Sequence, residues 1–199
     1  MHSVRLVSFA LGLWLAGGLF MAWVATQNFR GVDRLLDEPN PTAQLEIKAL
    51  DNSKEFGPGA ARMLLRYHAS EQNRYYFESW ELVQIVLGSM LFFFLLFATR
   101  DDKFSLSGVL LLLIVVAVQR AWLTPEIVKV GRSLDFVMPG LNAPDRAHFW
   151  QLHSLYSGAE VLKWVVLLTM TVRLVASRSR DVGKQFDVVD KADHRHVDR

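Results

Sequence analysis

The chain has 199 residues, of which 51% are hydrophobic and 21% are charged. Its 22 Lys and Arg are interleaved with 20 Asp and Glu, for a formal net charge of +2, and this pattern argues against a nucleic-acid-binding surface. The absence of cysteine excludes disulfides, thiolate metal sites and thiol catalysis.

The first predicted element is a membrane-spanning helix over residues 6–26, an apolar stretch long enough to cross the ~30 Å hydrocarbon core of a bilayer. A signal peptide is the alternative. Cleavage after Ala25 would place the bulky Trp23 at position −3, so we expect the helix to be retained. Gly18 and Ala22 form a small-xxx-small pair that allows another helix to approach closely. Glycine is common in membrane helices in any case, so the pair alone does not establish a contact.

A long polar connection, residues 31–77, separates the first span from the second. Within it, Asn40 and Pro41 predict a helix start, with Asn as the cap and Pro in the first turn. After a break at Gly57-Pro58-Gly59, the chain runs without proline or glycine into the second span, which predicts one long helix. We place three aromatic residues of this helix in an interfacial belt: Tyr75, Tyr76 and Trp80.

The second and third spans are predicted over residues 80–99 and 104–123. The charged turn between them, RDDK at residues 100–103, is so short that the two helices must be antiparallel neighbours. We expect the third span to stop before Pro125, because proline breaks a helix. A second polar connection then occupies residues 124–150.

The fourth predicted span covers residues 151–176, with Asp145 as the cap of its helix. It is the least apolar of the four spans, because it contains Glu160 and Lys163. The remaining residues, 178–199, are mostly polar and charged and are predicted to be a disordered tail.

Together these elements predict an all-α, polytopic membrane protein: a four-transmembrane-helix bundle over residues 1–177, with short extramembrane helices in the first connection. The connections at 31–77 and 124–150 would form a cap on one side. A dense basic block follows the fourth span and favours a cytoplasmic tail: Arg173, Arg178 and Arg180. We therefore expect an integral protein of a bacterial inner membrane, with both termini in the cytoplasm.

Polar side chains gather at one end of the predicted bundle. On a helical projection of 100° per residue, four of them form one stripe on the fourth span: His153, Ser157, Glu160 and Trp164. A charge that faces lipid is expensive, so this stripe is expected to face neighbouring helices or water. The other spans offer polar residues at the same depth. The candidate ligand-binding residues are therefore His153, Ser157, Glu160, Trp164, Arg120, Gln119, Glu81 and Gln84.

Structural roles for these charges compete with a ligand site. Glu160 either pairs with Arg120 on the third span or pairs with Lys163 three residues on, and long charged side chains near the headgroups snorkel to them. A metal site is disfavoured, because His153 and Glu160 are seven residues apart and no HExxH or ExxH pair is present. We expect no metal and no cofactor, and we assign no catalytic residue.

The leading functional prediction is an integral membrane protein of binding, accessory or transport-related type, with a polar pocket in the outer leaflet. The inner halves of the spans are almost purely apolar, so the pocket is expected to be blind rather than a channel. A membrane lipid or another hydrophobic small molecule, with its polar end near His153 and Arg120, suits such a site. One alternative is a membrane-embedded metal- or cofactor-dependent enzyme that uses His153, Glu160, Glu81 and Arg120. Another is a structural subunit that joins a larger membrane complex, or a homo-oligomer, through the first span.

Four sequence motifs occur in a distinctive order: LWLAGGLFMAWVA, RDDK, LTPEI and FWQLHSLYSGAE. In this order they resemble transmembrane protein 205 and its bacterial relatives, a family of small four-helix membrane proteins of poorly defined function. The resemblance covers about residues 5–176, implies the four-helix fold and implies that Arg120, Pro125 and His153 occupy marked family positions. The first connection departs from the pattern, because it is long here and contains the extra PTAQLEIKAL helix. The resemblance implies no catalytic activity.

The predicted topology places residues 31–77 and 124–150 on one side of the membrane and the tail on the other. Because the chain has no cysteine, single cysteines at Ser53, Asn142 and Ser179 can be labelled with an impermeant thiol reagent in intact cells. Ser53→Cys and Asn142→Cys should label together and Ser179→Cys separately. Any other grouping means that a span has been miscounted.

Overall fold

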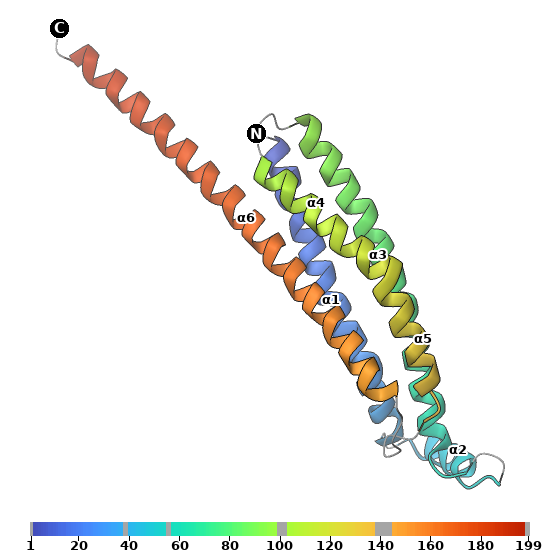
Figure 1. Cartoon of the computed structure of the whole chain (residues 1–199). Helices are drawn as coiled ribbons and strands as arrows, with labels where there is room; N and C mark the ends of the chain where they lie inside the picture. Colours follow the sequence, from blue (N-terminus) through green and yellow to red (C-terminus); the bar gives the residue numbers. More distant parts are fainter. Residues whose placement is uncertain (1, 38–39, 55–56, 99–102, 138–144, 198–199) are drawn as a thin grey trace.

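The structure, a computed structural model, describes residues 2–37, 40–54, 57–98, 103–137 and 145–197. The described residues are almost entirely helical and contain no strand. The elements are α1 (His2–Asp37), α2 (Pro41–Asp51), α3 (Ala60–Ala98), α4 (Lys103–Val118), a π-helical turn η1 (Gln119–Leu123), α5 (Thr124–Leu134) and α6 (Asp145–Val197) (Figure 1). The predicted all-α fold is therefore confirmed.

The long helices run side by side (Figure 1). Helix α1 packs against α3 and α6, α3 packs against α4, and α6 packs against both α4 and α5. The short helix α2 lies against the N-terminal part of α3, at the end of the bundle remote from the N-terminus (Figure 1). Three helical stretches are long and apolar enough to cross a membrane: Arg5–Asp37, Ala60–Phe97 and Lys103–Leu134.

Two helix starts follow the rules by which they were predicted. The side chain of Asn40 caps α2 by accepting hydrogen bonds from the backbone N–H groups of Thr42 (3.1 Å) and Ala43 (3.3 Å). Before α3, Gly57 and Gly59 have φ angles of 76° and 83°, a left-handed conformation that glycine adopts without steric cost. The prediction of one long helix from this break through the second span is confirmed by α3.

The prediction that the third span ends before Pro125 is wrong. The chain is continuously helical from Lys103 to Leu134, through α4, η1 and α5. A proline inside an α-helix clashes with the carbonyl four residues earlier and lacks an N–H donor. Here the π turn precedes Pro125, and the Thr124 N–H bonds to the carbonyl of Gln119, five residues back. This wider turn relieves the conflict, and the first part of the predicted second connection is therefore helix α5.

Two apolar clusters form the core. The larger lies toward the N-terminal end of α1 and consists of Val7, Leu11, Trp14, Leu91, Leu95, Val109, Leu112, Val116, Leu167, Met170 and Leu174. The smaller lies toward the α5 end and is centred on Leu123, Leu152 and Tyr156. The outer surface is also apolar, with Phe9, Met90 and Phe97 more than two-thirds exposed. An apolar exterior around a packed apolar interior is typical of a bundle that faces lipid.

Three glycines admit tryptophan rings into the helix contacts. The pairs are Gly17 with Trp80, Gly18 with Trp164 and Gly88 with Trp14. A Cβ atom on Gly17 would lie 2.2 Å from the Trp80 ring, so no larger residue fits without a shift. Trp80 is thus partly buried against α1, whereas Tyr75 is 67% exposed, and the placement of both in an interfacial belt stays a prediction. Gly18 allows the close approach that its spacing suggested, but the partner is α6 of the same chain.

Helix α6 extends well beyond the other helices (Figure 1). Its backbone is helical to Val197, across the segment for which composition predicts a disordered tail. The disorder of that tail stays a prediction. The predicted RDDK turn falls mostly outside the described residues, as do the turn signals at residues 139–144.

The glycine–tryptophan contacts make a testable prediction. Gly17→Ala should destabilise the protein by about 1–3 kcal/mol, because the added methyl group overlaps the Trp80 ring. Gly12→Ala is the matched control: nothing lies within 4 Å of a Cβ at that position, and alanine favours a helix by about 1 kcal/mol over glycine. Thermal unfolding in detergent measures both. Equal melting temperatures for the two variants would contradict the packing.

Candidate functional site

A layer of buried polar side chains separates the two apolar clusters. Every long helix contributes to it. Its buried members are Trp14 from α1, Glu81 and Gln84 from α3, Gln119 from η1, Thr124 from α5, and Tyr156 and Lys163 from α6. Glu160 of α6, with its side chain 14% exposed, completes the layer. Glu81, Gln84, Gln119 and Lys163 are each at most 1% exposed. Polar groups buried this deeply must be paired, because an unpaired charge in an apolar setting costs several kcal/mol.

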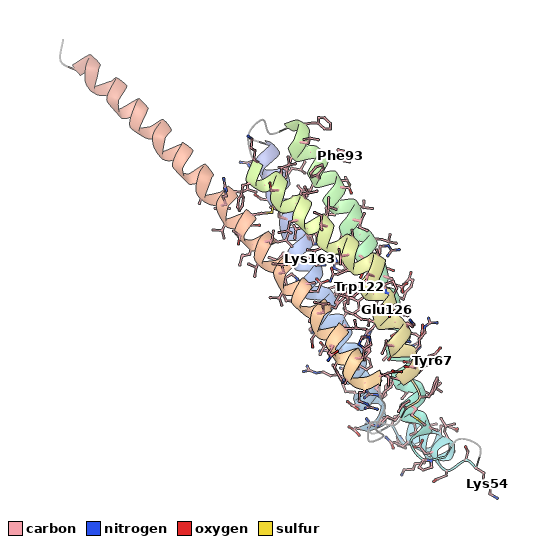
Figure 2. All side chains as sticks on the ribbon, in the orientation of Figure 1. Lys54, Tyr67, Phe93, Trp122, Glu126 and Lys163 are labelled. Atoms are coloured by element: carbon pink, nitrogen blue, oxygen red, sulfur yellow. The ribbon has the colours of Figure 1, made fainter. Side chains whose placement is uncertain are left out.

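Lys163, which is labelled on α6 in Figure 2, is the centre of one half of this layer by its hydrogen bonds. Its Nζ donates hydrogen bonds to Glu160 Oε1 at 2.8 Å and to Gln84 Oε1 at 2.6 Å. The Trp14 indole also donates to Gln84 Oε1, at 3.2 Å. Gln119 Nε2 donates to Glu160 Oε1 at 3.3 Å. One cation and one carboxylate thus connect α1, α3, η1 and α6 at a single level.

Glu81 is the centre of the other half. Its Oε1 accepts hydrogen bonds from Thr124 Oγ1 at 2.5 Å and from Tyr156 Oη at 3.3 Å. Its Oε2 lies 3.9 Å from Arg120 Nη1, which is an ion pair without a hydrogen bond. Within the described part of the chain, Glu81 Oε2 has no hydrogen-bond partner. The Tyr156 hydroxyl also interacts with Glu160, so the two halves of the layer meet at this residue.

An open pocket of about 460 Å³ lies beside Glu81, between α3 and the η1–α5 segment. Three cations, two carboxylates, one hydroxyl and two apolar residues line it: Arg120, Lys129, Arg132, Glu78, Glu81, Thr124, Pro125 and Val128. Arg120 is 38% exposed and donates a hydrogen bond to the backbone carbonyl of Glu78 at 3.1 Å. The pocket therefore has a charged, solvent-accessible mouth and a fully buried carboxylate behind it.

The structure brings together five of the eight sequence-predicted site residues. Glu81, Gln84, Gln119 and Glu160 belong to the buried layer, and Arg120 lies at its edge. Trp164 is half-buried and packs against Gly18. His153 and Ser157 are exposed, on a different face of α6. The pocket that the sequence placed around His153 is thus centred on Glu81 and Arg120 instead.

Within the described residues, the side-chain contacts of His153 and Ser157 are all with nearby residues of α6. The His153 ring stacks on Phe149 at 5.8 Å between centroids and meets Trp150 edge-on at 5.6 Å. Ser157 Oγ donates a hydrogen bond to the backbone carbonyl of His153 at 2.9 Å. In the described residues, no three His, Asp or Glu side chains lie close enough together to hold a metal ion.

The inward face of α6 differs from the predicted one by about 80° of rotation around the helix axis. Its buried positions follow a spacing of three, four or seven residues: Leu152, Tyr156, Lys163, Leu167, Met170 and Leu174. The predicted inward face was the stripe of polar residues, and Lys163 lies to one side of that stripe. The regular spacing of the large apolar residues was the signal that would have placed Lys163 and Tyr156 inside. Thr124 and Trp14 had no such signal.

The ion pair proposed between Arg120 and Glu160 is replaced in the structure by two other pairs. Glu160 contacts Lys163, three residues along the same helix, at 2.8 Å. Arg120 instead contacts Glu81 across to α3. Each of these two carboxylates therefore has a basic side chain within 4 Å.

The depth of the layer follows from the helical rise of 1.5 Å per residue. The guanidinium of Arg173 lies 4.0 Å from the ring centroid of Phe104, near the start of α4. Glu160 precedes Arg173 by 13 residues, or ~20 Å. Of the ~30 Å that a membrane-spanning helix covers, ~20 Å thus lies between Arg173 and the polar layer. The layer is therefore closer to the end of the bundle that contains α5 than to the end that contains Arg173.

Comparison of the chain with protein-family models, with curated proteins and with solved structures gives no match in any of the three searches. The resemblance to the transmembrane protein 205 family stays a prediction.

A double-mutant cycle tests the Lys163–Glu160 pair. Glu160→Gln and Lys163→Met should each lower the free energy of unfolding by about 3–5 kcal/mol, because each leaves a buried charge without its partner. The double variant should lose less than the sum of the two losses. Glu160→Gln with Arg120→Gln is the matched cycle, and those losses should simply add. If the Glu160–Arg120 cycle shows coupling and the Glu160–Lys163 cycle shows none, Glu160 is paired with Arg120 and the contacts described above are wrong.

Proposed function

We propose that this chain is an integral membrane protein with four spanning helices, and that it binds an amphipathic membrane molecule in the pocket between α3 and α5. The observation that carries this proposal is the position of a charged pocket at the end of an apolar, exposed helix face. This is a binding or accessory role, which includes carrying a lipid within or between leaflets.

The case for α6 as the fourth span rests on which way its residues face. Glu160 and Lys163 point into the bundle and are paired there. The outward face carries Val165, Leu168 and Val172, each more than half exposed. Because charges face inward and aliphatic side chains face outward, this section of α6 suits a lipid environment as well as its neighbours do.

The pocket lies at the depth expected for lipid headgroups. Glu78 precedes Phe97 by 19 residues on α3, or ~28 Å of helical rise, close to the ~30 Å thickness of a hydrocarbon core. From Glu78, the exposed residues Leu82 and Val86 follow at i+4 and i+8 on the same stripe of α3. A ligand with its polar end in the pocket would thus find an apolar surface for its tail.

The buried core argues against an ion path through the bundle. On the Arg173 side of the polar layer, Leu91, Val116 and Leu167 are each at most 4% exposed and belong to one apolar cluster. A hydrated ion would have no polar partner along such a route. The proposed site is therefore blind and opens at the membrane surface or sideways to lipid.

We also propose, from the sequence motifs alone, a relationship to the transmembrane protein 205 family, an inner-membrane location and cytoplasmic termini. The enzyme alternative would need His153 beside Glu160, Glu81 and Arg120, whereas His153 lies on an exposed face of α6. A structural-subunit role through the first span would have to use residues other than Gly17 and Gly18, which pack against tryptophans of the same chain.

Native mass spectrometry of the detergent-purified protein tests the binding role. The wild type should retain phospholipid, and Arg120→Gln/Lys129→Gln/Arg132→Gln should retain at least fivefold less, because charge-assisted hydrogen bonds to phosphate are lost. The control with the same change in charge is Arg34→Gln/Lys48→Gln/Lys54→Gln, at exposed positions outside the pocket (Lys54 is labelled in Figure 2). A wild type without bound lipid, or equal losses in both triple variants, would refute the proposal.

A further inference from the structure

The carboxylate behind the pocket has an unused acceptor. Glu81 is 0% exposed, and its Oε1 is already bonded to Thr124 and Tyr156. Its Oε2 accepts no hydrogen bond within the described residues, and Glu81 is one of the residues that line the pocket. A buried carboxylate oxygen without a donor is costly, and such an atom next to a cavity indicates a donor that arrives with a ligand.

The nearest cation does not fill this role. Arg120 is 3.9 Å from Glu81 Oε2, beyond hydrogen-bond distance, and its recorded hydrogen bond is to a backbone carbonyl of α3. At 38% exposure, its long side chain has room to swing toward the mouth. The groups that face Glu81 are Thr124 from α5, Tyr156 from α6 and Arg120 from η1, with Lys163 of α6 contributing a more distant positive charge.

The mouth of the pocket carries exposed cations, in contrast to the buried carboxylate behind it. Lys129 and Arg132 are 76% and 62% exposed, and their ion pairs are long, at 3.8 Å to Glu126 and 3.6 Å to Glu71. Exposed pairs of this length contribute little and are readily exchanged for a stronger partner. A phosphate group offers such a partner, because it accepts several charge-assisted hydrogen bonds at once.

We propose that the pocket recognises an aminophosphate headgroup, in which a primary ammonium and a phosphodiester are separated by a two-carbon linker, as in phosphatidylethanolamine. The ammonium donates to Glu81 Oε2, and the phosphodiester binds Arg120, Lys129 and Arg132. This assignment rests on the proposed function and specifies its ligand. The apolar stripe of Leu82 and Val86 beside the pocket favours the lipid over a free aminophosphate.

Other common headgroups fit the charges less well. Phosphatidylglycerol has hydroxyl donors but no cation, so it could give the buried carboxylate only a neutral hydrogen bond, without the charge assistance that an ammonium supplies. Phosphatidylcholine has a cation but no N–H group, and its three methyl groups keep the charge away from Glu81. The discrimination is therefore expected to follow the number of N–H donors on the headgroup nitrogen, which is a property that a merely electrostatic surface would not show.

The test uses the intact protein in detergent with equimolar lipids that share the same acyl chains, measured by native mass spectrometry. The wild type should retain phosphatidylethanolamine roughly tenfold over phosphatidylglycerol and phosphatidylcholine, with N-methylated and N,N-dimethylated forms in between. Glu81→Gln should bring these ratios close to one by lowering the retained phosphatidylethanolamine toward the level of the other two lipids, whose retention rests on the phosphate contacts. The control Glu46→Gln changes the same charge at an exposed position on α2 and should keep the wild-type ratios.

The outcomes separate the two proposals. Equal retention of all headgroups by the wild type overturns the aminophosphate assignment and leaves lipid binding intact, whereas no retained lipid overturns both. If Glu81→Gln fails to fold, the N-methylation series on the wild type still decides, since a flat series overturns the assignment. Excess soluble glycerophosphoethanolamine should displace little of the lipid. Complete displacement would overturn the lipid as the ligand in favour of a free aminophosphate.

Discussion

The structure depends on the pairing of Lys163 with Glu160 and Gln84. A lysine that is 1% exposed, inside a helix with an apolar outer face, is tolerable only where its charge is matched. The match comes from its own helix and from α3, and the indole of Trp14 on α1 binds the same glutamine oxygen. Because this contact fixes the rotation of α6 around its axis, it determines which of its residues face outward and which face the bundle.

The remaining features keep this layer in register. Glycines at positions 17 and 18 let α1 lie close to the rings of Trp80 on α3 and Trp164 on α6. The π turn before Pro125 allows α4 to continue as α5 and places both Gln119 and Thr124 inward. Thr124 then holds Glu81, and Glu81 borders the pocket. The pocket chemistry is therefore a consequence of the same packing that makes the buried charges tolerable.

Much of the fold could be predicted from the sequence, because caps, apolar runs and glycine breaks act locally. The Asn40 cap and the unbroken α3 follow from such local rules. The continuation through Pro125 could not be foreseen, because the π turn that accommodates it has no clear local signature. In the site, the polar residues of α3 and η1 were identified only because they lie at the same level along the predicted spans as the polar residues of the fourth span. His153 was misplaced because a polar stripe was taken as the buried face, whereas the buried face of α6 carries the large apolar side chains together with Lys163.

Site-directed spin labelling along α6 is the most direct test of the claim that this helix crosses the membrane with its charges turned inward. Single cysteines can replace Leu155, Val161, Leu168 and Val175, which are all at least half exposed. In liposomes, accessibility to oxygen relative to a polar nickel chelate should rise from Leu155, peak between Val161 and Leu168, and fall again by Val175. A uniformly high accessibility to the nickel chelate would place α6 in water and contradict the account.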